Sequence, residues 1–444
     1  MRLVHLGHAT WLLLAGGLRV LFDPILGPTH SGGTFSIVPR RRLDPRLLRA
    51  DFVLVSHAHP DHFDPASLAS LAQADPESVV ITPDPIVLEA AKVVGFRTVR
   101  QIEPGTRIDL DGGLTLVTTP SRAPDVEWGV LALDPTGVVW NLIDTVFESA
   151  AEVRSIRDAA TSGRAVDLAL APIQPMREIA LQTADYVGFD ARHYGHMLAC
   201  AQAVEARHLV PSAAGDAHAP PFTAMNAWVY PVSRERAARD FAAIAPGVRT
   251  VLPDLGDTLV IESGAVAIER GDFPVERLGD DPARVFRPLE PAPLVDPNLP
   301  GLSKALYRAR IHAWIEADLA PSLARELSPR AELGDIRLVL EVVYDEGRET
   351  FSFDRAGRRG GGDEDEYDVL NVIAASTLWE ALEGRRGWGA PLLAGALRSP
   401  RRGTTTSGGV ARPLAIAPIF LYYALSYRES VARAARRRAT ETRA

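Results

Sequence analysis

Hydrophobic and polar residues alternate in short runs along the first 270 residues of the chain. Runs of valine, leucine and isoleucine that end at glycine, proline or aspartate predict β-strands, among them WLLLA, RVLFD, DFVLVSH, LTLVTTP, GVVWNLID and DTLVIES. Segments with helical periodicity lie between these strands and predict helices at Asp64–Gln73, Ile86–Val94, Glu148–Ser162, His196–Arg207 and Ser233–Ala243. Many strands separated by modest helices indicate a layered α/β domain rather than a helical bundle.

A proline-rich stretch divides the chain. Seven prolines fall between Pro274 and Pro300, a composition that favours a semi-rigid, extended connector. We therefore predict an N-terminal domain at 1–272, a connector at 273–300 and a smaller α+β domain at 301–444. In the last of these we expect a helix near Leu302–Leu327, a strand at Ile336–Tyr344 and a helix that starts near Tyr367 and carries LNVIAASTLWEALEG. A basic tail begins at Arg428.

Length, charge and cysteine content narrow the functional classes. The 444 residues carry a formal net charge of −8, which argues against general nucleic-acid binding because phosphate contacts require a basic face. The single cysteine, Cys200, cannot form an intrachain disulfide or supply the cysteines of an iron–sulfur cluster. No run reaches the roughly 20 apolar residues of a membrane span. The apolar N-terminal run predicts two strands rather than a signal peptide, so we expect a cytoplasmic protein.

The sharpest chemical signal is HAHPDH at residues 57–62, directly after a predicted strand. His57 and His59 are two residues apart at a strand end, so their side chains point to the same side and can share one ion. The chain then turns and brings Asp61 and His62 to a neighbouring position. Imidazole and carboxylate groups together suit Zn²⁺, iron or Mn²⁺, and the absence of a nearby thiolate disfavours a purely structural zinc site.

This motif resembles the HxHxDH signature of the metallo-β-lactamase superfamily. The resemblance implies an αββα sandwich with a one- or two-metal site at the sandwich edge. The segment GHATWLLLAGGLRVLFDPIL resembles the opening hairpin of that family, and Asp144 in VVWNLIDT resembles its bridging aspartate. The implied ligands are therefore His57, His59, Asp61, His62 and Asp144, and Asp61 and His62 are also the candidate catalytic residues.

One branch of the superfamily is more closely similar. The segments DPRLLRADFVLVSHAHPDHFD and APDVEWGVLALDPTGVVWNLIDT resemble the part of CMP-N-acetylneuraminate hydroxylase that lies outside its Rieske domain. The similarity continues more faintly in YDVLNVIAASTLWEALEGRRGW. A Rieske centre requires two cysteines and two histidines, so oxygenase chemistry here would need an external electron donor.

Two ligand positions of the superfamily are filled by other residue types. Ala123 stands where the hydroxylase-like pattern has histidine, and PSAAG at 211–215 replaces a P-x-H-x-G motif. His218 follows shortly afterwards and is a candidate replacement ligand. Five more residues are candidates for substrate contact or for orienting a ligand, namely His8, Asp23, Arg122, His193 and His196.

These residues leave three functional hypotheses open. The first is a metal-dependent hydrolase that uses a metal-activated water on a small-molecule substrate of anionic character. The second is a non-haem iron oxidase or monooxygenase with a separate redox partner. The third is a family member that binds a ligand without turnover. Because Arg122 carries a permanent positive charge and one histidine is missing, we expect one tightly bound divalent ion, zinc, iron or manganese, and a second, weaker one.

Overall fold

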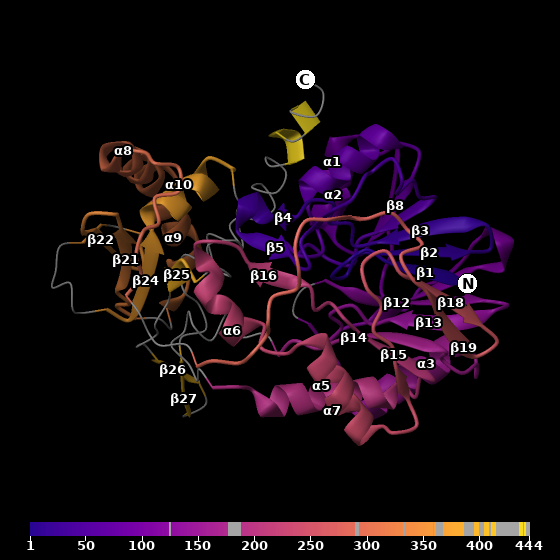
Figure 1. The fold of residues 1–444 in the computed structure, drawn as a ribbon. Coiled ribbons are helices and arrows are strands. Elements are labelled where there is room, and N and C mark those ends of the chain that lie inside the picture. The colour runs from indigo at the N-terminus through magenta and orange to yellow at the C-terminus, as the bar shows by residue number, and fades with distance from the viewer. Residues whose placement is uncertain are drawn as a thin grey trace.

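A computed structural model of the chain describes most of the two predicted domains. The described residues are 1–123, 126–175, 188–288, 293–331, 334–357, 359–360, 367–385, 395–398, 404–407, 410–413, 435–437 and 439–440. Figure 1 shows two bodies: residues up to about 290 form the larger one, and most of the described residues that follow form the smaller one, whereas the last described helical segment lies on the larger body, where Ala435 joins the core beneath α1 and α2.

Within the described ranges, the N-terminal domain contains two large sheets. The first has the strand order β19-β18-β1-β2-β3-β7-β8-β9, made of Ala265–Glu269, Thr258–Glu262, Arg2–His5, Trp11–Ala15, Leu18–Phe22, Phe52–Leu54, Val79–Thr82 and Thr98–Gln101. The second has the order β10-β11-β12-β13-β14-β15-β17, made of Arg107–Asp109, Thr115–Pro120, Trp128–Asp134, Gly137–Asn141, Leu168–Pro172, His208–Ser212 and Arg249–Thr250.

The two sheets pack face to face because both faces of each are apolar. In β2, Trp11 and Leu13 enter the core between the sheets, whereas Leu12 enters the core beneath the helices of the first sheet. In β13, Val139 faces the other sheet and Trp140 faces the helices of the second sheet. Two-residue periodicity with apolar residues on both sides is what a sheet buried on both faces requires.

Helices cover the outer faces and complete four layers (Figure 1). Helices α1 (Pro65–Ala74) and α2 (Pro85–Val94) pack on the first sheet, and α3 (Ala150–Thr161), α5 (Ala191–Ala203) and α7 (Arg234–Ile244) pack on the second. The expected αββα sandwich is therefore confirmed. One helix differs from the sequence prediction: α5 starts at Ala191 rather than His196, because Asp190 caps it by accepting a hydrogen bond from the backbone N–H of His193 at 2.9 Å.

Strand direction brings the motifs of the sequence to one edge of the sandwich. Strands β1, β3 and β7 run in the same direction, because β1 and β3 are both antiparallel to β2 and β3 is parallel to β7. His8, Asp23 and the HAHPDH segment follow the carboxyl ends of these three strands. Asp144 follows β13, which is parallel to β14 in the second sheet.

The connector predicted at 273–300 is anchored at both ends. Strand β20 (Glu276–Arg277) pairs with β6 (Arg41–Arg42) of the N-terminal domain, and the backbone N–H of Arg287 donates to the carbonyl of Ala227 at 3.0 Å. Near the other end, buried Asp296 accepts a hydrogen bond from the backbone N–H of Ser376 at 3.0 Å.

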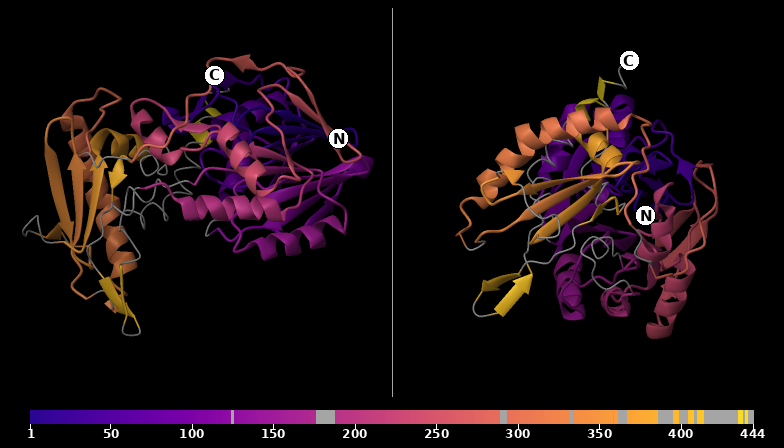
Figure 2. Two further views of the ribbon diagram at one scale, coloured as in Figure 1. Left: turned by 60° about the horizontal axis from the view of Figure 1, so that its bottom comes forward. Right: turned by 90° about the vertical axis from the view of Figure 1, so that its left-hand side faces the viewer.

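The described residues beyond the connector include a smaller α+β unit with its own core (Figure 2). Its extent as a domain over 301–444 stays a prediction. Its described strands are β21 (Leu338–Val343), β22 (Arg348–Phe353), β23 (Arg359–Gly360), β24 (Val369–Ala374), β25 (Leu397–Arg398), β26 (Thr404–Ser407) and β27 (Val410–Pro413). Helix α8 (Lys304–Trp314) continues through one π-helical segment at Ile315–Leu319 into α9 (Ala320–Leu327).

One C-terminal prediction is wrong. The helix expected from Tyr367 onwards starts only at Ala375, as α10 (Ala375–Leu382), and VLNVIA before it forms strand β24. This segment pairs in parallel with β21, and its residues alternate in burial. Tertiary pairing of a β-branched run therefore overrides the helical pattern. Most of the basic tail lies outside the described residues. None of the helices in the described ranges combines the length and apolar character that a membrane crossing requires.

A buried ion pair stabilises a small sheet beside the sandwich edge, formed by β4 (Thr29–His30), β5 (Phe35–Ile37) and β16 (Asp216–His218). His30 Nε2 lies 3.0 Å from Asp216 Oδ1, and the Tyr230 hydroxyl donates to Asp216 Oδ2 at 2.8 Å. Burial lowers the pKa of His30, but attraction to Asp216 outweighs burial and leaves the pKa raised.

This pair should make stability pH-dependent. Because the folded pKa of His30 is raised, its contribution is complete below the unfolded pKa of about 6.5 and is lost as the pH rises through the folded value. We expect His30→Gln to lower the free energy of unfolding by about 3 kcal/mol at pH 6 and by less at pH 9. Urea unfolding at both pH values measures this difference, and an equal loss at both would contradict it.

Candidate metal centre

The HAHPDH segment is fixed by its backbone as it leaves β7. The carboxylate of Asp84, which caps α2 by accepting from the backbone N–H of Ile86 at 2.7 Å, also accepts from the backbone N–H of Ala58 at 3.1 Å. Asp64 then caps α1 by accepting from the backbone N–H of Ser67 at 2.9 Å. Two helix caps therefore hold the ends of the motif in place.

Asp23 is linked by hydrogen bonds to two histidines of the motif, directly to His62 and through Ser56 to His57. Its carboxylate is buried and accepts from the backbone N–H of Ser56 at 2.8 Å and from the Ser56 hydroxyl at 2.9 Å. Asp23 Oδ2 also lies 2.9 Å from Nδ1 of His62. Since the Ser56 hydroxyl proton is used on Asp23, Ser56 Oγ accepts from His57 Nδ1, 2.8 Å away.

These contacts fix the tautomers of both rings. With Nδ1 protonated and hydrogen-bonded, the Nε2 atoms of His57 and His62 are left as the nitrogens that can bind a cation. His62 Nε2 lies 3.1 Å from Asp144 Oδ2, and His57 Nε2 lies 2.8 Å from His59 Nδ1. Asp23 therefore contacts His62 directly and His57 through Ser56. Its predicted role in orienting metal ligands stays a prediction.

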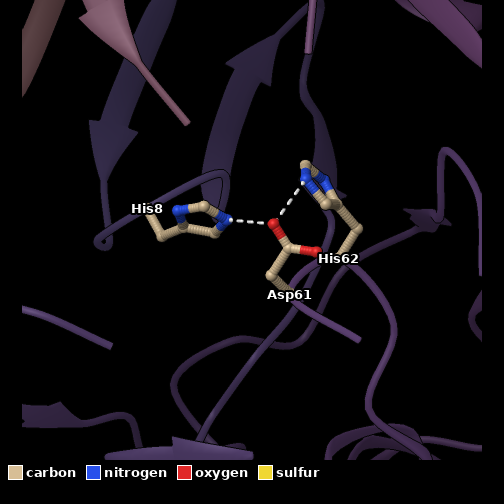
Figure 3. Close-up of side chains that lie close together, drawn as sticks. All are labelled: His8, Asp61 and His62. Carbon is tan, nitrogen blue, oxygen red and sulfur yellow. Dashed lines mark hydrogen bonds and ion pairs between the residues drawn. The ribbon is translucent and has the colours of Figure 1, made fainter. Parts of the chain in front are cut away.

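A second group forms around Asp61. Figure 3 shows Asp61 between His8 and His62, with one carboxylate oxygen directed at both rings. Asp61 Oδ2 lies 3.2 Å from His8 Nε2 and 3.3 Å from His62 Nε2. The backbone N–H of Gly215 donates to His8 Nδ1 at 3.1 Å, so in neutral His8 the proton is on Nε2 and is donated to Asp61. His8 has a positive φ of 53°, which turns its ring towards this group.

The charges of the site are arranged around a cation. Burial, reinforced by His59 and His62, holds the pKa of His57 well below its usual value, so this imidazole is neutral. Burial also lowers the pKa of His62, but Asp144 and Asp61 outweigh it and hold the pKa well above the ordinary value. Burial raises the pKa of Asp61, yet His62 and His8 bring it well below the usual range. Without a metal, the two carboxylates thus favour a proton on His62 Nε2, and a bound cation would take the place of that proton.

The donor atoms fit a divalent metal. In the described part of the chain, the potential ligand atoms of His57, His62 and Asp144 lie within 4.8 Å of one another, as do those of His8, Asp61 and His62. Both sets combine neutral or ionisable imidazole with carboxylate, the donor types that zinc, iron and manganese accept. The two sets share His62, so they lie side by side.

Other predicted residues lie at varying distances from these groups. His59 is exposed but close to His57. His218 lies in β16, where its ring packs against Phe35 and Tyr230, and it belongs to neither group of the described residues that could hold a metal. Arg122 is exposed, and its Nε donates to Glu152 on α3 at 2.7 Å.

The remaining two histidines line a neighbouring cavity. His193 is exposed and His196 is half-buried on α5, and both border a cavity that also contacts Asp144. Their predicted role in substrate contact stays a prediction.

Sequence reasoning missed Glu127, at the start of β12. Its side chain is buried, and the Ser121 hydroxyl donates to Glu127 Oε1. Ser121 Oγ also accepts from the backbone N–H of Val146, two residues beyond Asp144, at 3.0 Å. Burial first, and then the charge of Asp144, raise the pKa of Glu127 to about 7. An acidic residue directly before the apolar run WGVLALD was the available signal, four residues beyond the Ala123 position where histidine is missing.

Comparison with known proteins identifies the family. A family model described as a beta-lactamase superfamily domain matches residues 2–121. A UPF0173 metal-dependent hydrolase from Opitutus terrae is 30% identical over 179 residues, which cover 39% of this chain and 72% of that protein. The chain belongs to the metallo-β-lactamase superfamily. The predicted family is confirmed, and a divalent-metal site at the sandwich edge is supported by its relatives and by the ligand groups.

Two further relatives of this protein have names that refer to an iron–sulfur protein and a hydroxylase. A protein from Mycolicibacterium smegmatis, whose name includes the words Rieske 2Fe-2S iron-sulfur protein, is 28% identical over 155 residues, 32% of this chain and 30% of that protein. Cytidine monophosphate-N-acetylneuraminic acid hydroxylase from Danio rerio is 37% identical over 78 residues, 18% of this chain and 13% of that protein. The chain therefore spans less than a third of the length of either relative, and the resemblance to the hydroxylase is confirmed for the matched segment.

Proposed function

We propose that the protein is a metal-dependent hydrolase of a small-molecule substrate, with the ion or ions held by His57, His59, Asp61, His62 and Asp144. The observation that carries the proposal is the orientation of His57 and His62. Their Nδ1 atoms are committed to Ser56 and Asp23, so the Nε2 atom of His62 is directed at Asp144 and that of His57 at His59. This arrangement is the one that a metal site with oriented ligands requires.

The surrounding residues supply the rest of the chemistry. A bound divalent metal would lower the pKa of a water ligand from about 15.7 towards 7 and polarise the bond to be cleaved. Asp61 is ionised and partly accessible, so it can accept a hydrogen bond from the attacking water. His8 donates to the same oxygen of Asp61 and fixes its direction. Asp61 and His62 are thus the residues proposed to handle protons.

Metal reconstitution tests this function. The protein stripped with a chelator should hydrolyse neither 4-nitrophenyl acetate nor bis(4-nitrophenyl) phosphate above background. Zinc or manganese should restore turnover of at least one of the two substrates, and Asp61→Asn should lack that turnover even when it is supplied with excess zinc. Equal turnover of the chelated and reloaded protein would contradict the proposal.

A second candidate function, an iron oxygenase, is favoured by Glu127. The charges of Asp144, His59 and His62 influence the pKa of this buried carboxylate. In the sequence it follows Ala123, the position where the superfamily histidine is missing, by four residues. Two histidines of the HAHPDH segment and one carboxylate would make the ligand set that is typical of non-haem iron oxygenases. The matched hydroxylase segment supports the same candidate.

Glu127→Gln separates the two functions. If the protein is a hydrolase, zinc-dependent turnover should change by less than about threefold, because Glu127 would not handle the reacting proton. If it is an oxygenase, the iron-loaded wild type should consume O₂ in the presence of a chemical reductant, and Glu127→Gln should lose both iron and O₂ uptake. Metal analysis by mass spectrometry and an oxygen electrode measure the two outcomes.

A further inference from the structure

A cavity of about 160 Å³ lies directly beside the metal centre. It is bounded by the loop that follows β13, by the end of β14 and by one face of α5. Asp144, whose Oδ2 lies 3.1 Å from His62 Nε2, forms part of its wall. The cavity therefore opens beside a proposed metal ligand.

Apolar side chains make up most of the wall. Leu142, Phe147, Ala171 and Ala201 are buried there, and Met197 is half-buried. Methionine and small residues line sites that accept apolar groups of variable shape. Burial of an apolar group in this cavity would remove its surface from water.

Polar side chains of the cavity wall already form hydrogen bonds within the protein. Gln174 donates from Nε2 to the carbonyl of Val232 at 2.7 Å and accepts from the backbone N–H of the same residue at 3.3 Å. His196 donates from Nε2 to the carbonyl of Phe147 at 2.8 Å. A ligand therefore meets few unsatisfied polar groups inside the cavity, whereas the charged groups lie at Asp144 and the metal centre.

We propose that the cavity receives an apolar group, up to the size of a benzene ring, of a small amphiphilic anion whose acidic head binds at the metal centre. An enclosed cavity of about 150 Å³ lined by aliphatic and aromatic side chains binds benzene. The cavity beside Asp144 has a similar volume and is open to solvent on one side. The proposal that an apolar group binds here is inferred from the cavity alone. The position of the acidic head rests on the proposed metal-dependent function.

Calorimetric titration of the zinc-loaded protein with three carboxylates tests the inference. Phenylacetate should bind at least about tenfold more tightly than acetate, because its ring is buried in the cavity. The larger 1-naphthylacetate should gain nothing over phenylacetate, because its second ring exceeds the cavity. Equal affinities for acetate and phenylacetate would overturn the proposal.

Two variants on α5 provide a matched pair. Ala201 lines the cavity, so Ala201→Leu should fill part of it and reduce the preference for phenylacetate over acetate to less than about threefold. Ala199 is exposed on the same helix, so Ala199→Leu should keep the full preference. An unchanged preference in folded Ala201→Leu would place the ring elsewhere and overturn the proposal.

Benzene provides a measurement that needs neither the variant nor the metal. It should raise the melting temperature of the metal-free wild type and, in the zinc-loaded protein, compete with phenylacetate but not with acetate. If benzene has neither effect, the cavity proposal fails. If these results hold but no hydrolysis is found, the cavity proposal stands and only the proposed reaction fails.

Discussion

Replacement of His57 by alanine is expected to remove most of the bound metal and all metal-dependent activity. His57 is buried and neutral, its Nδ1 is held by Ser56, and one of its ring nitrogens lies within 4.8 Å of ligand atoms of His62 and Asp144. Alanine removes one ligand atom and also leaves the Ser56 hydroxyl oxygen without the hydrogen bond from His57 Nδ1. We therefore expect zinc affinity to fall by more than the 10- to 100-fold typical of losing a group that only orients a ligand.

Zinc titration of the metal-free protein, with metal content measured by mass spectrometry, checks this expectation. His312→Ala is the matched control, because His312 lies in the C-terminal domain and pairs with Glu349 at 3.0 Å. The control should bind zinc like the wild type. Wild-type stoichiometry and affinity in His57→Ala would refute the assignment of His57 as a ligand.

Asp23→Asn should weaken both the metal site and the fold. The Asp23 carboxylate accepts three hydrogen bonds, from the backbone N–H of Ser56, from the Ser56 hydroxyl and from His62 Nδ1. An asparagine amide places a donor against one of these donors and removes the buried negative charge. We expect zinc affinity to fall about 10- to 100-fold and the free energy of unfolding of the metal-free protein to fall by about 3 kcal/mol.

Asp51→Asn is the control for this variant. Asp51 is exposed and accepts from the backbone N–H of Arg19 at 2.7 Å, at the opposite end of β7. Its replacement should change stability by less than about 1 kcal/mol and leave zinc binding intact. If Asp23→Asn behaved like Asp51→Asn in both measurements, Asp23 would not orient the ligands.

Local pattern was sufficient to predict most of the N-terminal fold. Apolar residues on both faces of β2 and β13 indicate strands buried between layers. Helix caps such as Asp64 mark helix starts, and α1 begins within one residue of its predicted start. The prediction failed where a partner strand decides the outcome. The pattern of VLNVIA predicts part of a helix, whereas in the structure this segment is a strand because it pairs in parallel with β21.

The candidate ligands His57 and His59 could be predicted from their spacing, and Asp144 from the family resemblance and its place after a strand. His57 and His59 share a side of an extended chain, and Asp144 follows a parallel strand at the same edge. Arg122 could not be placed in the same way, because its direction depends on the acidic residues of α3. Glu127 was missed because its burial is a tertiary property. The prediction of one tight ion and one weaker ion stays a prediction.

Anomalous diffraction from crystals of the zinc-loaded protein tests the central claim most directly. We expect a zinc peak at the sandwich edge, about 2.0–2.1 Å from the Nε2 atoms of His57 and His62, with Asp144 also coordinating. If two ions are bound, each should lie at this distance from one of the two histidines. A zinc peak that avoids these side chains, or the absence of any peak at this edge in crystals grown with excess zinc, would contradict it.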